Sequence, residues 1–221
     1  MFVPKLDAMP TTQRLFWNEL RSTPRSFVLY GGTAMALRLG HRQSLDFDFF
    51  TNDVFEPSQL LSHITYLKNA RVDQRGDNTL SVVVMRNGPV RLSFFGDVQM
   101  NRVDDPDVSA DNALQIAALL DLAATKLKTI QQRAEAKDYR DIASALIAGI
   151  RLERALGAAR AICGTTFNAM AALKALTYFG DGNLQELPTD VQTALQNAAQ
   201  SVRLENLPTL TAKPGITRAE F

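Results

Sequence analysis

The chain has 221 residues, of which 46% are hydrophobic and 21% are charged, a composition typical of a folded globular protein rather than a disordered one. Its formal net charge is only +1, so overall charge gives no general attraction to nucleic acid or to a membrane surface. Cys163 is the single cysteine, which excludes an internal disulfide and a zinc site built from cysteines.

The first half of the chain alternates short helical patterns with short runs of β-branched and aromatic residues. Thr11 and Thr12 are suited to capping a first helix, and Asn87-Gly88 is a strong signal for a two-residue hairpin. Helices are predicted at about 11–20, 33–39 and 57–69. Strands are predicted at 27–30, 45–50, 80–85 and 90–95.

From residue 110 onward, alanine and leucine recur at helical spacing. The polar segment 96–109 has the composition of a linker. The sequence therefore predicts an α+β fold with an N-terminal α/β lobe, residues 1–107, and a C-terminal helical lobe, residues 108–221. Helices of the second lobe are predicted at 114–130, 134–150, 152–162, 167–179 and 189–204.

The N-terminus, Met-Phe-Val-Pro-Lys-Leu-Asp, lacks the basic and apolar regions of a signal peptide. No segment reaches the roughly 18 apolar residues that are typical of a membrane span. We therefore expect a cytoplasmic protein with no membrane partner.

Two aspartates lie two residues apart on a predicted strand. Side chains alternate between the faces of a strand, so Asp46 and Asp48 point to the same side while Phe47 points to the other. Neighbouring carboxylates repel each other unless a cation lies between them, and oxygen ligands suit Mg²⁺ or Mn²⁺. Taken alone, the pair favours the alternative, an ordinary half-exposed strand that carries acidic residues outward.

A glycine pair precedes these aspartates at the end of the previous strand. Gly31-Gly32 lets the backbone approach an anion closely, and the helix that follows offers unpaired N–H groups and the positive end of its dipole. Thr33 adds a hydroxyl at the same place. The order of strand, Gly-Gly, short helix and Asp-x-Asp strand predicts a phosphate cradle beside a metal site. A plain strand-to-helix turn is the alternative.

The run from Leu29 to Leu37, followed by His41 to Phe50, closely resembles the AbiEii toxin family of the DNA polymerase β-like nucleotidyltransferase superfamily. The resemblance covers roughly 27–145. It implies that the first lobe is a nucleotidyltransferase-like lobe with a small mixed β-sheet flanked by helices, and that the second is a helical bundle. It also implies a nucleotide triphosphate (NTP) as substrate, Mg²⁺ or Mn²⁺ bound by Asp46 and Asp48, and an antitoxin protein as partner.

A polar stripe follows in the helical half, where Lys126, Arg133, Lys137 and Asp141 are separated by seven, four and four residues. On one continuous helix these side chains would share a face. They resemble the family's later Lys and Lys-Asp-x-x-Asp motifs. In that interpretation Lys126 neutralises developing charge, Asp141 orients or deprotonates the acceptor, and Arg133 and Lys137 bind phosphate or acceptor. A solvated helix face with a Lys137–Asp141 pair is the alternative.

Several nearby polar residues complete the predicted site. Arg42 and Ser44 lie in the turn before the Asp-x-Asp strand, where Arg42 is suited to contact phosphate or base and Ser44 to bind a phosphate or cap the turn. Many superfamily members carry a third carboxylate on a later strand, where this chain offers Ser93. Four arginines lie on or near the predicted sheet and are expected to be scattered and solvated rather than to form one basic face for RNA: Arg71, Arg75, Arg86 and Arg91.

The leading hypothesis is an NTP- and Mg²⁺-dependent nucleotidyltransferase that is the toxin of a toxin–antitoxin or abortive-infection system and acts on RNA such as tRNA. Gly31, Gly32 and Thr33 would cradle the triphosphate. A second hypothesis keeps the chemistry and replaces RNA by a small-molecule or protein acceptor. A third, prompted by Ser93, is a catalytically silent regulator that binds nucleotide.

Overall fold

The computed structural model describes residues 2–111 and 114–218. It has a mixed α+β fold, and the described residues form one seven-stranded sheet with the order β3-β4-β5-β2-β1-β7-β6. The chain divides into two compact units. The sheet unit comprises Met1–Met100, Asp105–Ala118 and Gly215–Phe221, and the helical unit comprises Asn101–Asp104 and Leu119–Pro214. No helix in the described part of the chain is long and apolar enough to cross a membrane.

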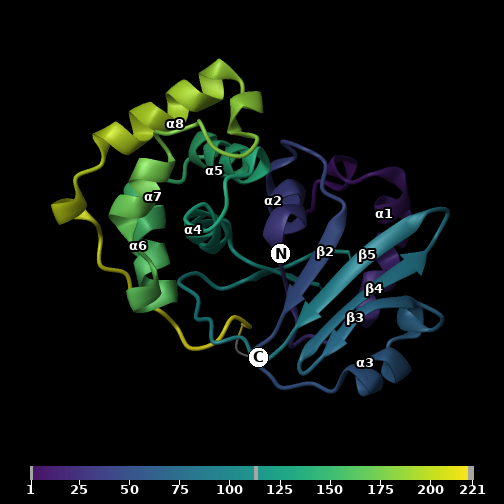
Figure 1. Cartoon of the computed structure of the whole chain (residues 1–221). Coiled ribbons are helices and arrows are strands. Elements are labelled where there is room, and N and C mark those ends of the chain that lie inside the picture. The colour runs from purple at the N-terminus through teal and green to yellow at the C-terminus, as the bar shows by residue number, and fades with distance from the viewer. Residues whose placement is uncertain (1, 112–113, 219–221) are drawn as a thin grey trace. The chain divides into compact units, whose positions relative to one another are not determined.

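The centre of the sheet is formed by strands that are distant in sequence (Figure 1). β2, Asp46–Phe50, pairs in parallel with β5, Pro89–Phe95, and antiparallel with β1, Val28–Tyr30. β4, Thr79–Met85, and β5 form the hairpin predicted at Asn87-Gly88, but the pairing of Met85 with Pro89 leaves a loop of three residues, Arg86 to Gly88, instead of two. β3, Arg71–Gly76, is the edge strand next to β4.

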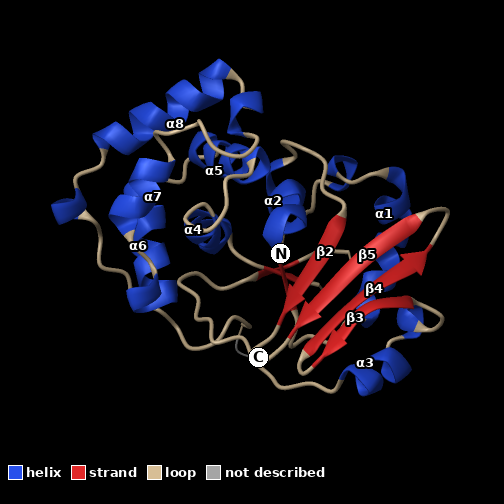
Figure 2. Cartoon of the chain, viewed as in Figure 1, coloured by secondary structure: helices blue, strands red, loops and turns tan. Residues whose placement is uncertain are grey.

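One face of this sheet forms the core of the sheet unit because its inward positions are aromatic or aliphatic. Phe47, Phe49, Leu92 and Phe94 are buried there. Phe16, from α1, packs on this face with its ring centroid 6.3 Å from that of Phe47. The helices of this unit are α1, Thr11–Phe16, α2, Gly31–Leu39, and α3, Pro57–His63 (Figure 2).

The opposite face of β2, β5 and β4 is polar. Alternation along each strand places Asp46 and Asp48, Arg91 and Ser93, and Ser81 on this side, where all five residues are exposed or half-buried. The sheet is therefore apolar on the face covered by helices and carries the predicted acidic pair on the other face.

The helical unit is built on alanine- and leucine-rich helices, as predicted. The central helix α4 packs against α6 and α5. Alanines such as Ala124 and Ala158 are fully buried, and their small side chains allow these helices to approach closely. The helices of this unit are α4, Leu119–Thr129, α5, Ala136–Ile147, α6, Leu152–Cys163, α7, Ala169–Ala175, and α8, Thr189–Ser201.

Three strands of the sheet were not expected from the sequence. β3 was not predicted, because all of its residues are exposed and show no alternation. The predicted helix 114–130 begins only at Leu119, because Gln115–Ile116 instead forms strand β7 and pairs in parallel with β1. The predicted linker contains the short strand β6, Asp107–Val108. The division into lobes at 1–107 and 108–221 stays a prediction.

Candidate active site

The acidic pair lies in a pocket on the polar face of the sheet. The pocket has a volume of about 200 Å³, and both Asp46 and Asp48 contribute to its wall. Because β2 and β5 run in parallel, Asp46 lies opposite Arg91 and Asp48 opposite Ser93. The pocket is lined by Asp46, Asp48, Asp73, Ser81, Val82, Arg91, Leu92 and Ser93.

The glycine pair lies directly against this acidic pair. Tyr30, the last residue of β1, is opposite Asp48, so Gly31 follows beside the Asp48 side chain. Gly31 has a φ of +71°, and a Cβ atom added there would lie 2.8 Å from Oδ2 of Asp48. A Cβ atom added to Gly32 would lie 2.6 Å from Nη2 of Arg42 and 3.0 Å from Oγ of Ser44. The structure therefore brings these predicted residues together: a side chain at Gly31 would displace the Asp48 carboxylate, and one at Gly32 would displace the flexible end of Arg42.

Helix α2 begins at Gly31, two residues earlier than predicted. The backbone N–H groups of its first turn have no partner inside the helix, and they carry the positive end of the helix dipole. A phosphate held there would lie next to Asp48, which is the relationship that the sequence order predicted.

The hydroxyl of Thr33 holds the start of β2. It donates to the backbone carbonyl of Asp46 and forms a hydrogen bond of 3.0 Å with the hydroxyl of Ser44, from which it accepts. Thr33 is only 1% exposed. Its side chain therefore positions the first aspartate. Arg42 donates from Nη1 to the carbonyl of Gln43 over 2.9 Å, which shapes the turn before β2.

The residues present fit a divalent cation of the kind that nucleotides bring. Two carboxylates on one strand face, beside a helix N-terminus, match the way in which Mg²⁺ is held by one or two carboxylates together with substrate phosphates. Among residues 2–111 and 114–218, no group of three or more His, Cys, Asp or Glu side chains could hold a metal on its own. Substrate oxygens would therefore complete the coordination.

The later polar residues form a buried ionic cluster in the helical unit. Nζ of Lys126 lies 2.6 Å from Oδ1 of Asp138 and 2.8 Å from Oδ2 of Asp141. The side chain of Lys126 is 8% exposed, and both aspartate side chains are fully buried. Arg133 binds the second oxygen of Asp138 over 2.9 Å. Burial alone would raise the pKa of Asp138, but the hydrogen bond from Arg133 and the charge of Lys126 bring it below its usual value.

The predicted continuous stripe is corrected by this geometry. α4 ends at Thr129 and α5 begins at Ala136, so the four residues do not share one helix. Lys137 pairs with Glu135 over 2.7 Å, whereas Asp141 pairs with Lys126, so the Lys137–Asp141 pair of the alternative interpretation is wrong as well. Asp138, which sequence reasoning did not assign to the site, links Lys126 and Arg133.

Sequence reasoning also missed part of the pocket wall. Asp73 lies on the unpredicted strand β3, and Oδ1 of this residue accepts from Nε of Arg71 over 2.8 Å. The hydroxyls of Ser81 and Ser93 are 3.1 Å apart on β4 and β5. Ser93 was expected at the place of a third carboxylate, and it does lie opposite Asp48, whereas Arg91 could have been assigned to this face only if the pairing of β2 with β5 had been known.

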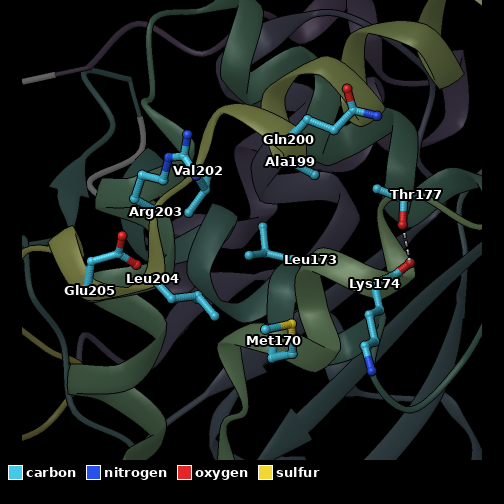
Figure 3. Close-up of a pocket in the computed structure, with 10 residues that line it drawn as sticks. All are labelled: Met170, Leu173, Lys174, Thr177, Ala199, Gln200, Val202, Arg203, Leu204 and Glu205. Atoms are coloured by element: carbon cyan, nitrogen blue, oxygen red, sulfur yellow. Dashed lines mark hydrogen bonds between the residues drawn. The ribbon is translucent and has the colours of Figure 1, made fainter.

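A second pocket, of about 370 Å³, lies within the helical unit (Figure 3). It is open and mostly apolar, and Glu205 is the one carboxylate in its wall. It has neither an acidic pair nor a Gly-Gly turn, so it does not suit a metal-bound nucleotide. Its lining residues are Met170, Leu173, Lys174, Thr177, Ala199, Gln200, Val202, Arg203, Leu204 and Glu205.

This fold is nucleotidyltransferase-like: it combines the Gly31-Gly32 turn, the acidic strand β2 and a mixed sheet. Solved structures share it. JHP933 from Helicobacter pylori aligns with a TM-score of 0.55 and 16% identity, over 90% of this chain and 92% of that protein. MenT4, a nucleotidyltransferase toxin from Mycobacterium tuberculosis, aligns with a TM-score of 0.52 and 17% identity over the same shares. An antigenic nucleotidyltransferase-like protein from Paracoccidioides brasiliensis aligns with a TM-score of 0.51 and 19% identity, over 88% and 94%.

The family follows from the sequence itself. Residues 18–210 match the family described as nucleotidyl transferase AbiEii toxin, type IV toxin–antitoxin system, and the chain belongs to this family of nucleotidyltransferases. An uncharacterized protein of Aquifex aeolicus is 34% identical over 118 residues, which are 52% of this chain and 55% of that relative. The chain thus spans about half the length of this curated relative. The resemblance stated from the motifs is confirmed.

Proposed function

We propose that this protein is an NTP- and Mg²⁺-dependent nucleotidyltransferase toxin that modifies an RNA acceptor, for which the 3′ end of tRNA is our example. One observation carries the proposal: the Asp46–Asp48 pair lies directly against the Gly31-Gly32 turn that begins α2. This proximity supports the proposal, because such a turn is suited to bind phosphate and such a carboxylate pair is suited to bind a divalent metal.

Each residue of the sheet unit has a distinct proposed role. The first-turn amides at Gly31, Gly32 and Thr33 bind triphosphate oxygens. Arg42 contacts a phosphate from the side of Gly32, and Ser44 together with the Thr33 hydroxyl fixes the start of β2. Asp46 and Asp48 hold Mg²⁺ or Mn²⁺, which when bound supplies charge neutralisation at the α-phosphate.

The proposed reaction is a displacement at phosphorus. The acceptor hydroxyl oxygen forms a bond to the α-phosphorus, the bond to the bridging oxygen of the β-phosphate breaks, and pyrophosphate leaves. The hydroxyl proton passes to a base, a role that we propose for Asp141. Lys126 would offset the developing charge, with Arg133 and Lys137 binding phosphate or acceptor. Because Lys126 and Asp141 are buried and ion-paired, their substitution tests catalysis only where folding is retained.

The biological setting that we propose follows the family. A type IV toxin–antitoxin family implies a cognate antitoxin protein that opposes the toxin in the cytoplasm. A catalytically silent nucleotide-binding regulator is the second candidate, and the position of Ser93 opposite Asp48 favours it, because a hydroxyl stands where many relatives of the superfamily carry a third carboxylate.

Label transfer tests the proposal. The protein is incubated with Mg²⁺, total cellular RNA and each α-³²P-labelled NTP in turn. We expect label on an RNA band, lost in Asp46→Asn and Asp48→Asn and kept in Asp53→Asn, which changes an exposed carboxylate just beyond β2. Metal-dependent NTP binding without transfer to RNA, small molecules or protein would support the silent regulator. No NTP binding at all would contradict both candidates.

A further inference from the structure

Arg91 differs from the other arginines of the sheet unit that were expected to be scattered and solvated. Arg71 pairs with Asp73 over 2.8 Å, Arg75 with Glu56 over 3.2 Å, and Arg86 with Glu19 over 2.8 Å. Each of these charges is thus balanced locally. The Arg91 side chain makes no hydrogen bond and no ion pair with the described residues, although its charge acts at longer range on Asp73, and it lines the pocket of Asp46 and Asp48.

The position of Arg91 is set by sheet register. It lies on β5 opposite Asp46, and two residues further along β5 Ser93 lies opposite Asp48. Ser81 on β4 lies opposite Ser93, with their hydroxyls 3.1 Å apart. An exposed guanidinium and two hydroxyls therefore share one small pocket beside the acidic pair. This combination of donors recognises a phosphate together with sugar hydroxyls.

The order of the strands assigns this pocket to one of the two substrates. β2 lies between β1, which leads into the glycine turn, and β5, which carries Arg91 and Ser93. β4 continues the sheet on the β5 side (Figure 1). In the proposed function the triphosphate occupies the β1 side of Asp46 and Asp48. The β5 side is then left for the acceptor. The nucleoside part of an NTP has no anionic group to match Arg91.

We infer that the pocket on β5 and β4 binds the 3′-terminal nucleotide of an RNA acceptor, with Arg91 contacting its last internucleotide phosphate and Ser93 and Ser81 contacting its ribose. This inference rests on the proposed function and names the acceptor subsite of the same reaction. Guanidinium is the suitable group because its planar fork binds two phosphate oxygens at once. Arg91 is thus a specificity-determining residue for an acceptor that carries a phosphodiester.

The test removes the phosphate charge and the arginine separately. A synthetic tRNA acceptor-stem hairpin is prepared with a normal last linkage and with an uncharged methylphosphonate there. Acceptor KM, NTP KM and kcat are measured for the wild type, Arg91→Gln and Arg91→Lys. The control is Arg75→Gln, which removes an exposed charge of the same sheet that lies outside the pocket. Circular dichroism confirms folding.

We expect Arg91→Gln to raise the acceptor KM roughly 10- to 100-fold, the range for one lost charge-assisted contact, with the NTP KM unchanged. The acceptor KM of Arg91→Lys should lie between those of the wild type and Arg91→Gln, because lysine keeps the positive charge but loses the planar fork of the guanidinium. In the wild type, replacing the normal linkage by the methylphosphonate should raise the acceptor KM by a similar factor. In Arg91→Gln the same replacement should change the acceptor KM little. Arg75→Gln should behave as wild type.

Three results would overturn the inference while leaving the proposed function intact: equal methylphosphonate costs in wild type and Arg91→Gln, a raised NTP KM with an unchanged acceptor KM, or equal losses in Arg91→Gln and Arg75→Gln. A wild-type protein that transfers no label to any RNA overturns the proposed RNA activity, and the acceptor subsite is then rejected with it. The reaction of the wild type therefore distinguishes a failure of the proposed RNA activity from a failure of the acceptor subsite alone.

Discussion

A Cβ atom added to Gly31 would lie 2.8 Å from Oδ2 of Asp48, closer than real Cβ atoms approach an oxygen. The backbone of the glycine turn and the carboxylate of the acidic strand therefore occupy adjoining space. Two motifs separated by most of α2 and the following turn depend on each other sterically. The identity of Gly31 is set both by this contact and by its φ of +71°.

Gly31→Ala should impair nucleotide binding more than it impairs folding. The left-handed φ costs a non-glycine residue about 1–2 kcal/mol, and the new methyl group must displace the Asp48 carboxylate. We expect metal-dependent NTP affinity to fall at least about tenfold, the effect of about 1.4 kcal/mol, measured by isothermal titration. The matched control is Gly149→Ala, where φ is +96° and nothing lies within 4 Å of the added Cβ. Equal NTP affinity in the two variants would contradict the steric argument.

Local signals were enough to find the glycine turn and the acidic pair. The Gly-Gly break and the alternation of Asp46, Phe47 and Asp48 are properties of short segments, so they can be recognised without the fold. The Asn87-Gly88 hairpin is local in the same sense, and the structure confirms the hairpin, although its loop has three residues.

The features that could not be predicted from the sequence depend on partners that are distant in sequence. Arg91 lies beside Asp46 only because β5 pairs with β2, and Gln115–Ile116 is a strand only because β1 accepts it. The residues of β3 are all exposed and give no period. The interruption between α4 and α5 turned a predicted surface stripe into a buried cluster around Lys126.

Lys126→Met should destabilise the helical unit strongly. The change removes the cation between Asp138 and Asp141 and leaves two buried carboxylates facing each other, a loss that typically costs about 3–5 kcal/mol. Urea denaturation followed by circular dichroism measures it. Lys137→Met is the control, since its pair with Glu135 is half exposed and such pairs contribute less than about 1 kcal/mol. Similar midpoints for the two variants would show that the buried cluster contributes little.

Thr33→Val should weaken the link between α2 and β2. Valine matches threonine in shape but can neither donate to the Asp46 carbonyl nor hydrogen-bond the Ser44 hydroxyl, so both part-buried groups lose a partner. We expect a loss of about 1–3 kcal/mol in unfolding free energy, together with weaker metal-dependent NTP binding. Thr33→Ser keeps the hydroxyl and should retain most of both properties. If valine is tolerated as well as serine, the hydroxyl does not position Asp46.

Asp121 should make the stability of the helical unit depend on pH between about 4 and 6. Its carboxylate accepts backbone N–H groups from Val103 and Asp104 over 2.9 and 3.2 Å, but burial outweighs these bonds and raises its pKa to about 6. The folded chain then binds the proton more tightly than the unfolded chain. The stability contributed by this group is therefore full below about pH 4 and is lost as the pH rises through about 6.

Asp121→Asn isolates this effect, because asparagine stays neutral at every pH while carboxylates that do not interact with Asp121, such as Asp138, titrate alike in both proteins. The pKa shift of about two units corresponds to about 3 kcal/mol. Relative to the wild type, the unfolding free energy of the variant should therefore rise by up to about 3 kcal/mol between pH 4 and pH 7.5. Part of this rise is already complete at pH 5, where urea denaturation is more practical than at pH 4. Asparagine keeps only one of the two acceptor oxygens that receive the backbone N–H groups. The unfolding free energy of the variant is therefore below that of the wild type at acid pH, and the difference shrinks as the pH increases. Parallel stability curves for the two proteins would show that Asp121 titrates at its ordinary pKa and that its burial is offset by its two backbone donors.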